Sequence, residues 1–439
     1  MKYRVLIHAD SLIRDPAYML VLAEVLRAHG VEPLVSSRIT TGFYLRTWKP
    51  HVLVHSQAHT LRGYYDHGLI DKRRGPAVIF IPQEGNNSGH STLRRGFRGV
   101  LDEPAAQVIR RVFHFNDWHV DWFAKNSSFR RDQLIHLGNP RLDIAKFGGF
   151  GEPRSKTGVI GFVGRFPTIN KYDGTSAFYH LLEDHTGHPA EWHDQTIGLV
   201  SRQIGVAHWY GQFIHWLMRE TDLKVSLRPH HEERRNSDGY RRLKDRYGER
   251  IQIDHGMSIF HWARSVDAII STTSLTSIES YLAGTPFLCV DKLALAEKSV
   301  LADNDEASLL KIMDERFVPH GLEDFGEKIR NVCAGSLPVG VNSGMEAYLK
   351  EHFSWPYTGS LIARIADGIL ETLECSPRQP AIPALPKFAG DLFYLLRTAQ
   401  FGGRRPWIVT DKNYSPFFHP APEFVDTIAR RILAECPRT

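Results

Sequence analysis

Short apolar runs alternate with amphipathic stretches along the first part of the chain. Residues 3–9, YRVLIHA, are nearly all apolar, as expected of a strand buried on both faces. Residues 17–30 place apolar side chains at helical spacing and end at Gly30, a common helix stop. Strands that alternate with helices in this way pair in parallel through right-handed crossovers. Further strands are expected at 31–37, 51–57, 77–84 and 111–117.

A segment rich in glycine and proline interrupts this alternation. Residues 134–158 contain five glycines and two prolines, which favours a linker between domains. From Ser376 the chain becomes proline-rich. We therefore expect α/β domains at 1–150 and 151–375, and an extension at 376–439 that packs back on the first domain. Within the second domain, strands are expected at 158–166, 223–230, 250–254, 267–274 and 285–291, and helices at 205–220, 239–248 and 258–265.

The composition is that of a soluble globular protein. The 439 residues are 42% apolar and 23% charged, which is enough for two hydrophobic cores. A net charge of +5 suits an anionic ligand but is too weak to indicate nucleic acid. The four cysteines lack metal-ligand spacing, no long apolar window occurs, and the N-terminus lacks a signal-peptide layout. We expect a cytoplasmic protein without a metal site.

A run of serine and threonine occupies residues 271–277, where a buried strand gives way to a helix. Free N–H groups and the dipole at a helix N-terminus attract phosphate, and hydroxyls there add donors. Thr273, Ser274 and Ser277 are therefore candidate phosphate ligands, and Glu279 could accept bonds from ribose hydroxyls. The alternative is an ordinary helix cap, in which the hydroxyls bind the helix itself.

Two further strands of the second domain end in polar residues. The strand at 223–230 ends in Arg228, Pro229 and His230, and arginine and histidine side chains both bind phosphate. The alternative is a solvated basic loop. The strand at 158–166 runs into Gly164 and Arg165. They lead into a loop with candidate sugar- and phosphate-binding side chains, which also fits a plain turn: Asn170 and Asp173.

One carboxylate of the first domain is placed for proton transfer. The apolar strand at 77–84 ends at Glu84, on a loop that continues with Asn86, Asn87 and His90. Burial at such an edge raises a carboxyl pKa toward the range of a general base. The alternative is a solvated loop glutamate. No dinucleotide fingerprint, Walker A or HExxH spacing occurs, so we expect no NAD and no other cofactor.

Taken in order, these pieces resemble those of bacterial surface-carbohydrate biosynthesis proteins, which are GT-B glycosyltransferases related to the Kdo and sialic acid transferases. The similar segments are GNPRLD, GRFPTINKYDG, RPH and STTSLTSIESYLAGTPF, within residues 1–370. The related transferases carry an acidic-acidic-Gly motif and a His-Pro motif. Here these read QEG, with Gln83 in place of an acid, and RPHH, with His231 in place of proline.

The resemblance implies a GT-B-like fold: two Rossmann-like, doubly wound domains facing each other across a cleft. It implies a metal-independent enzyme that transfers a sugar, with Kdo or another nonulosonic acid from a CMP-sugar expected, to a glycan or lipid-linked acceptor. Glu84 would act as the base, His230 would hold the leaving phosphate, and Asp173 is the candidate nucleophile of a retaining route. Open alternatives are a CDP-glycerol-type glycerophosphotransferase, a nucleotide-sugar epimerase and a silent scaffold.

An amphipathic stretch lies within the C-terminal extension. Phe388, Leu392, Leu395 and Leu396 form an apolar stripe with arginines nearby. Such a stretch could dock at an anionic membrane face, where a lipid-linked acceptor would be found. The alternative, which we favour, is a helix that crosses back onto the first domain.

Overall fold

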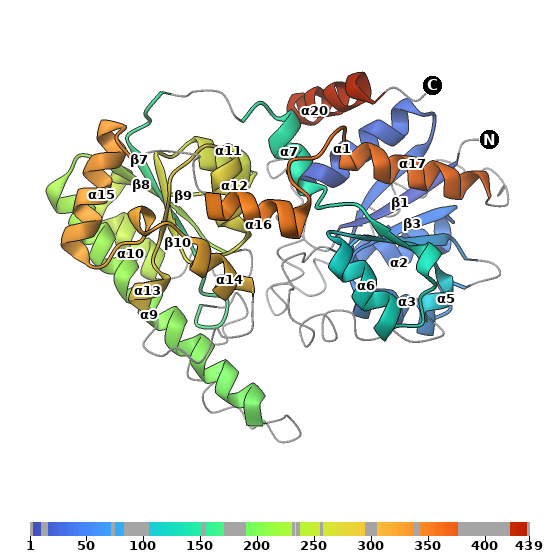
Figure 1. The fold of residues 1–439 in the computed structure, drawn as a ribbon, viewed down its shortest axis with the longest axis horizontal. Helices are drawn as coiled ribbons and strands as arrows, with labels where there is room; N and C mark the ends of the chain where they lie inside the picture. Colours follow the sequence, from blue (N-terminus) through green and yellow to red (C-terminus); the bar gives the residue numbers. More distant parts are fainter. Residues whose placement is uncertain are drawn as a thin grey trace. The chain divides into compact units, whose positions relative to one another are not determined.

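The computed structural model divides into two compact units, each with its own parallel sheet (Figure 1). The first unit comprises Met1–Gly148, Tyr348–Gly403 and Ile408–Thr439, and the second comprises Gly149–Ala347 and Arg404–Trp407. The structure describes residues 3–9, 16–71, 75–82, 105–150, 155–170, 190–230, 233, 238–254, 258–294, 305–337, 343–375 and 422–436.

The first unit is built on a six-stranded parallel sheet with the order β2-β1-β3-β4-β5-β6. The chain leaves β1 toward β2 on one side and returns to β3 on the other, so the order reverses between β1 and β3. Ligands of open α/β sheets bind outside the carboxyl ends of the strands at such a reversal. The strands are β1 (Arg4–Ala9), β2 (Glu32–Ser37), β3 (Val52–His55), β4 (Ala77–Phe80), β5 (Ile109–His114) and β6 (Leu134–His136).

Helices cover both faces of this sheet. On β5, Val112 packs into the same core cluster as Phe123 of α6. Phe113, the next residue, points to the opposite face, because a Cβ added at Gly368 of α17 would lie 2.8 Å from its ring. The helices of the unit are α1 (Pro16–Ala28), α2 (Arg38–Thr47), α3 (Ala58–Asp66), α5 (Ala105–Val108), α6 (Asp117–Asn126), η1 (Arg131–Gln133), α7 (Arg141–Phe147), α17 (Leu361–Glu374) and α20 (Pro422–Glu435).

The end of the chain contributes to the first unit. Helix α17 packs on α1 and β3, and α20 packs on α1 and α7. Asp143, in the GNPRLD segment, accepts hydrogen bonds from the Tyr357 hydroxyl at 2.5 Å, the Ser360 hydroxyl at 2.6 Å and the Ile362 amide at 2.7 Å. Its carboxylate therefore fixes the N-terminus of α17, and burial raises its pKa.

The second unit has a five-stranded parallel sheet with the order β11-β10-β7-β8-β9. The chain builds β7, β8 and β9 in one direction and then returns to place β10 beside β7. The order therefore reverses between β7 and β10. The strands are β7 (Val159–Val163), β8 (Lys224–Arg228), β9 (Ile251–Ile253), β10 (Ala268–Ser271) and β11 (Phe287–Cys289).

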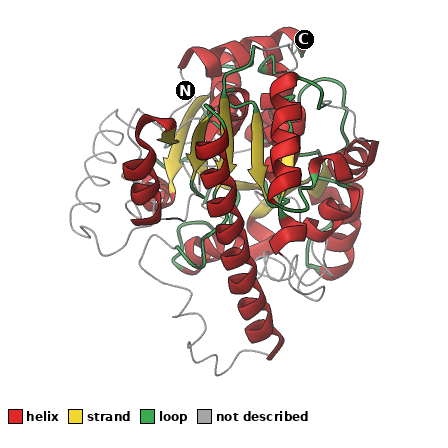
Figure 2. Ribbon diagram, turned by 90° about the vertical axis from the view of Figure 1, so that its left-hand side faces the viewer, coloured by secondary structure: helices red, strands yellow, loops and turns green. Residues whose placement is uncertain are grey.

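Both faces of the second sheet are also covered, as Figure 2 illustrates with strands lying between helices. Phe213 of α9 stacks on Phe325 of α15, with ring centroids 3.9 Å apart, in the core beside β7. On the other face, Trp262 of α11 lies so close to Gly161 that a Cβ there would be 2.7 Å from its ring. The helices are α9 (Ala190–Glu220), α10 (Asp238–Tyr247), η2 (Gly248–Arg250), α11 (Ile259–Arg264), α12 (Leu275–Leu282), α13 (Asp291–Ala294), α14 (Asp305–Ile312), η4 (Glu315–Phe317), α15 (Leu322–Ala334) and α16 (Ser343–Phe353), which crosses the unit boundary.

The predicted α/β class with two parallel, doubly wound sheets is confirmed. Two details differ from the sequence-based expectation. The segment expected to be a linker contains β6 and α7 of the first sheet's unit. The second domain was expected to run to residue 375, but α17 belongs to the first unit because it packs on α1 and β3. Of the expected extension, the structure describes 422–436, and the apolar stripe from Phe388 to Leu396 lies outside the described residues.

Candidate functional site

The candidate site lies at the carboxyl edge of the second sheet. Val163, the last residue of β7, pairs in register with Arg228, the last residue of β8. The next amide, of Gly164, donates to the Arg228 carbonyl at 2.7 Å. Ser271 ends β10 on the other side of β7, where the strand order reverses. The three polar segments that the sequence singled out in this unit therefore converge at one edge.

The hydroxyl run after β10 is bonded largely within the protein. Ser274 is the N-cap of α12, and its hydroxyl accepts from the Thr276 amide at 3.2 Å. The Ser277 hydroxyl donates to the Ser274 carbonyl at 2.6 Å. The Thr273 amide and hydroxyl donate to Asp291 at 2.6 and 2.8 Å. The helix-cap alternative is thus realised, and a phosphate here would meet the amides of the helix N-terminus by displacing a cap.

Asp291 is a residue of the candidate site that the sequence reasoning missed. It follows β11, is fully buried, and forms an ion pair with Arg202 of α9 at 2.5 Å. The Cys289 thiol also donates to it at 3.3 Å, and burial raises the pKa of that thiol well above its usual value. The signal was available: Asp291 is the polar residue at the carboxyl end of an apolar strand, like the candidates that were chosen.

Arg228 interacts electrostatically with two acidic groups. Its guanidinium donates to Asp254, which follows β9, and lies over the Trp262 ring at 5.6 Å. Burial lowers the pKa of Arg228, and the negative charges of Asp254 and Glu279 oppose that shift. Glu279 is itself buried on α12. The predicted phosphate ligand and the predicted ribose ligand are therefore electrostatic neighbours, and the charge of Arg228 is balanced within the protein.

Glu233 is the second residue that the sequence reasoning missed. Its buried carboxylate accepts from the amides of Phe166 at 2.9 Å and His230 at 3.1 Å. It also accepts from the Tyr240 hydroxyl at 2.6 Å and the Asn170 amide group at 3.4 Å. Burial raises the pKa of Glu233, and these four donors act against that rise. In the sequence it stands within HHEERR, which reads as a solvated charge run.

The predicted site residues thus fall into two groups. Two lie outside the described residues: Glu84 and Asp173. Those brought together at the carboxyl edge of the second sheet are Gly164, Arg165, Asn170, Arg228, His230, Thr273, Ser274, Ser277 and Glu279. Chemically, this edge combines a helix N-terminus, cationic side chains and a carboxylate at a strand-order reversal, which suits a phosphorylated, hydroxyl-bearing ligand.

The carboxyl edge of the first sheet has a different lining. His8 of β1 and His55 of β3 stack with ring centroids 4.1 Å apart at an interplanar angle of 11°, at that sheet's own reversal. Thr41 lies 2.8 Å from the His8 ring nitrogen and 2.7 Å from the Ser36 hydroxyl. Farther along, His114 is fully buried, and burial, with neighbouring positive groups as a smaller cause, lowers its pKa well below the usual value.

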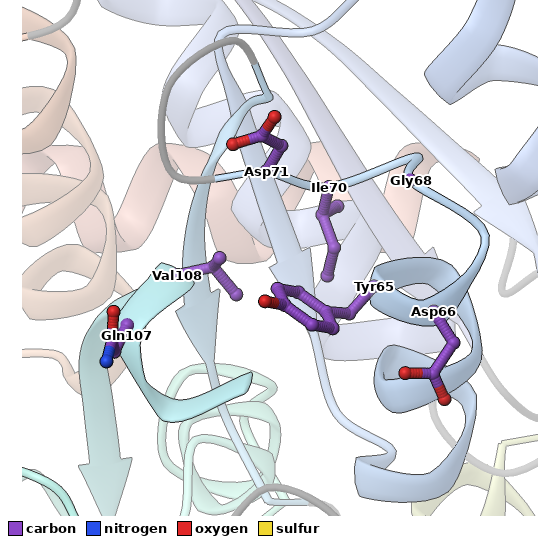
Figure 3. Close-up of a pocket in the computed structure, with 7 residues that line it drawn as sticks. All are labelled: Tyr65, Asp66, Gly68, Ile70, Asp71, Gln107 and Val108. Carbon is purple, nitrogen blue, oxygen red and sulfur yellow. The ribbon is translucent and has the colours of Figure 1, made fainter. Parts of the chain in front are cut away.

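A pocket of about 480 Å³ opens at the opposite, amino edge of the first sheet (Figure 3). Tyr65 and Asp66 close α3, and Gln107 and Val108 precede β5. Asp66 is already bonded to Arg62 at 2.8 Å. Because ligands of open α/β sheets bind at the carboxyl ends, this pocket is a poor match for the main site.

The part of the chain that the structure describes contains neither a metal-binding cluster nor a helix that could span a membrane. Its histidine, cysteine, aspartate and glutamate side chains do not form a group of three that could hold a metal ion. None of its helices combines the length and the apolar character needed to cross a membrane. The expectation of a reaction without metal or cofactor stays a prediction.

No family model matches the chain, and no curated protein matches it. Solved structures do resemble it. A variant of the wall teichoic acid polymerase TagF aligns with a TM-score of 0.50 at 11% identity, over 85% of this chain and 89% of the other. The S. aureus MnaA–UDP complex gives 0.49 at 11%, over 88% and 100%. The Neisseria meningitidis UDP-GlcNAc 2-epimerase bound to UDP-GlcNAc gives 0.45 at 11%, over 86% and 100%.

The fold is of the GT-B type. This follows from the two parallel-sheet α/β units together with the likeness to TagF over most of both chains. At 11% identity the likeness concerns the fold alone, so function has to be argued from the site.

Proposed function

We propose that the chain is a glycosyltransferase of surface-polysaccharide synthesis that binds a nucleotide sugar at the carboxyl edge of its second sheet. The observation that carries the proposal is the convergence of three segments from distant parts of the sequence. Gly164 and Thr273 follow β7 and β10, Arg228 ends β8 beside β7, and a backbone hydrogen bond joins Gly164 to Arg228. A fold that gathers phosphate- and hydroxyl-binding groups at a strand-order reversal is suited to a nucleotide.

In this proposal the donor phosphate meets the N-terminus of α12. Thr273 and Ser274 belong to the segment that binds this phosphate. The hydrogen bonds of Thr273 to Asp291 and of Ser274 to Thr276 keep the segment ordered before the ligand binds. Glu279 accepts from the ribose hydroxyls. Arg228 and His230 stabilise the charge that develops on the leaving phosphate.

The acceptor side of the proposal rests on the sequence. The first unit binds the acceptor, and Glu84 takes the proton from the attacking hydroxyl, so that the bond to the sugar forms as the bond to phosphate breaks. Asp173 is the candidate nucleophile for a retaining route. Gly164, Arg165 and Asn170 complete the donor side. The motif resemblance supports Kdo or a related acid from a CMP-sugar as the donor.

A second candidate is a glycerophosphotransferase that uses a CDP-linked donor. The GNP and RPH segments are similar to those of such polymerases, and the fold is shared with the teichoic acid polymerase TagF. The same edge would then bind CDP, and the group transferred would carry a phosphate.

The proposal is tested by the thermal stability of the purified protein with CMP, CDP, UDP or GDP. A nucleotide at a hundred times its Kd adds about 2.7 kcal/mol of stability, which is readily measured as a rise in Tm. Glu279→Gln should reduce the rise, because the ribose loses a charged acceptor. The exposed Glu346→Gln, in the same unit, is the matched control and should leave it unchanged.

The four nucleotides separate the candidates. A rise with CMP alone supports the CMP-sugar transferase, and a rise with CDP supports the glycerophosphotransferase. A rise with UDP directs the next assay to an epimerase, which would turn over its substrate without an acceptor. If none of the four raises Tm, the nucleotide site is refuted and a silent scaffold becomes the better account.

A further inference from the structure

We propose that Glu233 is the positioning residue of the donor site: its carboxylate fixes the loop after β7 and the turn after β8 relative to one another. The link to nucleotide affinity rests on the proposed function. The link between the two segments rests on geometry alone and is tested separately below.

Both carboxylate oxygens of Glu233 accept hydrogen bonds from more than one segment. Oε1 of Glu233 accepts from the Phe166 amide, in the loop after β7, and from the His230 amide, in the turn after β8. Oε2 accepts from the Asn170 side chain in the same loop and from the Tyr240 hydroxyl on α10. One buried side chain thus binds three separate segments of the second unit.

The Glu233 carboxylate lies directly against the backbone of Gly164. A Cβ added at Gly164 would lie 2.5 Å from Oε1 and 2.9 Å from Oε2 of Glu233. Side chains cannot approach that closely, so glycine at 164 is what allows the carboxylate to reach the Phe166 and His230 amides. Gly164, one of the predicted site residues, therefore has a structural role, which is to leave room for the Glu233 carboxylate.

Glu233 acts by positioning other residues of the donor site. Four donors within the protein use the acceptor capacity of both Glu233 oxygens. The carboxylate therefore does not bind the ligand itself. The two backbone amides that Glu233 binds lie close to predicted phosphate-binding side chains. Phe166 follows Arg165, and the other amide is that of His230. Glu233 therefore fixes the backbone positions from which the Arg165 and His230 side chains extend. Its contribution to ligand binding is preorganisation of these two residues.

The test compares Glu233→Leu, Glu233→Gln and a matched control, Asp143→Leu. Asp143 is also a buried carboxylate bonded to a tyrosine, a second side chain and a backbone amide, but it lies in the first unit. Hydrogen exchange of the full chain without ligand reports on the Phe166 and His230 amides. Glu233→Leu should speed their exchange by about tenfold or more, since a hydrogen bond to a buried charge is lost.

Nucleotide affinity is the second measurement, made with whichever of CMP, CDP, UDP or GDP stabilises the wild type. Glu233→Leu should weaken its Kd by about tenfold or more, and Asp143→Leu should leave it unchanged although it also costs stability. Glu233→Gln keeps an oxygen for the two amides, so it should restore most of the protection and affinity. A purely structural role predicts equal effects of Glu233→Leu and Asp143→Leu on affinity, and that outcome overturns the proposal.

Gly164→Ala keeps the experiment decisive if Glu233→Leu does not fold. The new methyl group displaces the carboxylate without removing it, so the His230 amide, on a different segment from residue 164, should exchange faster. Unchanged exchange at His230 overturns the proposal. If the wild type binds none of the four nucleotides, the proposed function fails while the exchange data still decide the role of Glu233.

Discussion

The carboxyl edges of the two sheets occupy the same place in their folds and differ in chemistry. The first edge is lined by imidazoles, with His8 and His55 stacked at the strand-order reversal. The second edge holds buried carboxylates, Glu233 and Asp291, each with several donors directed at it. Neutral rings can be buried side by side without counter-ions, whereas a buried carboxylate is tolerated only where donors converge on it.

The two edges are therefore fixed in different ways. Charge-assisted bonds hold the loops of the second edge, so those loops are set by electrostatics before any ligand binds. The first edge depends on ring stacking and on hydrogen bonds to hydroxyl groups, so each contact should contribute less stability, and the buried His114 makes this edge sensitive to protonation. Three experiments probe this contrast.

The largest expected effect comes from breaking the buried ion pair of the second edge. Asp291→Asn leaves the buried Arg202 without its carboxylate and weakens the bonds to Thr273, which should cost about 3–5 kcal/mol of stability. Urea unfolding measures it. Glu315→Gln is the control, because it removes an exposed partner of the neighbouring Lys292 and should cost less than about 1 kcal/mol. Equal losses would contradict the view that burial decides the contribution.

A smaller effect is expected on the first edge. Thr41→Val keeps the side-chain shape but removes the hydroxyl between His8 and Ser36, which should cost about 1–2 kcal/mol. Thr47→Val on the same helix loses only a bond to its own helix carbonyl and should be within about 0.5 kcal/mol of wild type. Denaturant midpoints distinguish the two, and a loss as large as that of Asp291→Asn would remove the contrast between the edges.

The smallest expected effect is the pH dependence that His114 gives to the first edge. The folded-state pKa of His114 lies below the unfolded value of 6.5, so below that pH the unfolded chain binds more protons. The contribution of His114 to stability is complete above pH 6.5 and is lost as pH falls, by about 1 kcal/mol between pH 6.5 and 5.5.

His114→Leu should flatten this part of the stability profile, as measured by urea midpoints at a series of pH values. The exposed His67→Leu serves as the control. If the profile of His114→Leu matches that of the wild type, His114 is not the group that makes the first edge sensitive to acid.

Local pattern predicted much of the fold because buried parallel strands are continuous apolar runs. It placed each strand of the second sheet within a few residues, and it marked the polar residues that follow β7, β8 and β10. It missed β6, a three-residue strand inside a glycine-rich stretch. Short strands carry too few positions for a period to be recognised.

The partners of the site residues could not be predicted in the same way. Asp143 binds residues more than two hundred positions away, and Asp291 binds Arg202 of α9. Such contacts depend on how elements pack, which no local pattern reports. Glu233 was missed for a related reason: a carboxylate among charged neighbours reads as solvated until its donors are known.

Helix α20, at the end of the chain, covers α1 at the beginning, and this has a consequence for biosynthesis. The first sheet leaves the ribosome early, but α17, which packs on α1 and β3, and α20, which packs on α1 and α7, are made after most of the second unit. At about 5–20 residues per second, tens of seconds separate them. During that interval the nascent chain exposes an apolar surface while the second unit, which is nearly continuous in sequence, is able to complete itself. We expect chaperones to engage the nascent first unit, and premature termination before α20 to yield a protein that aggregates.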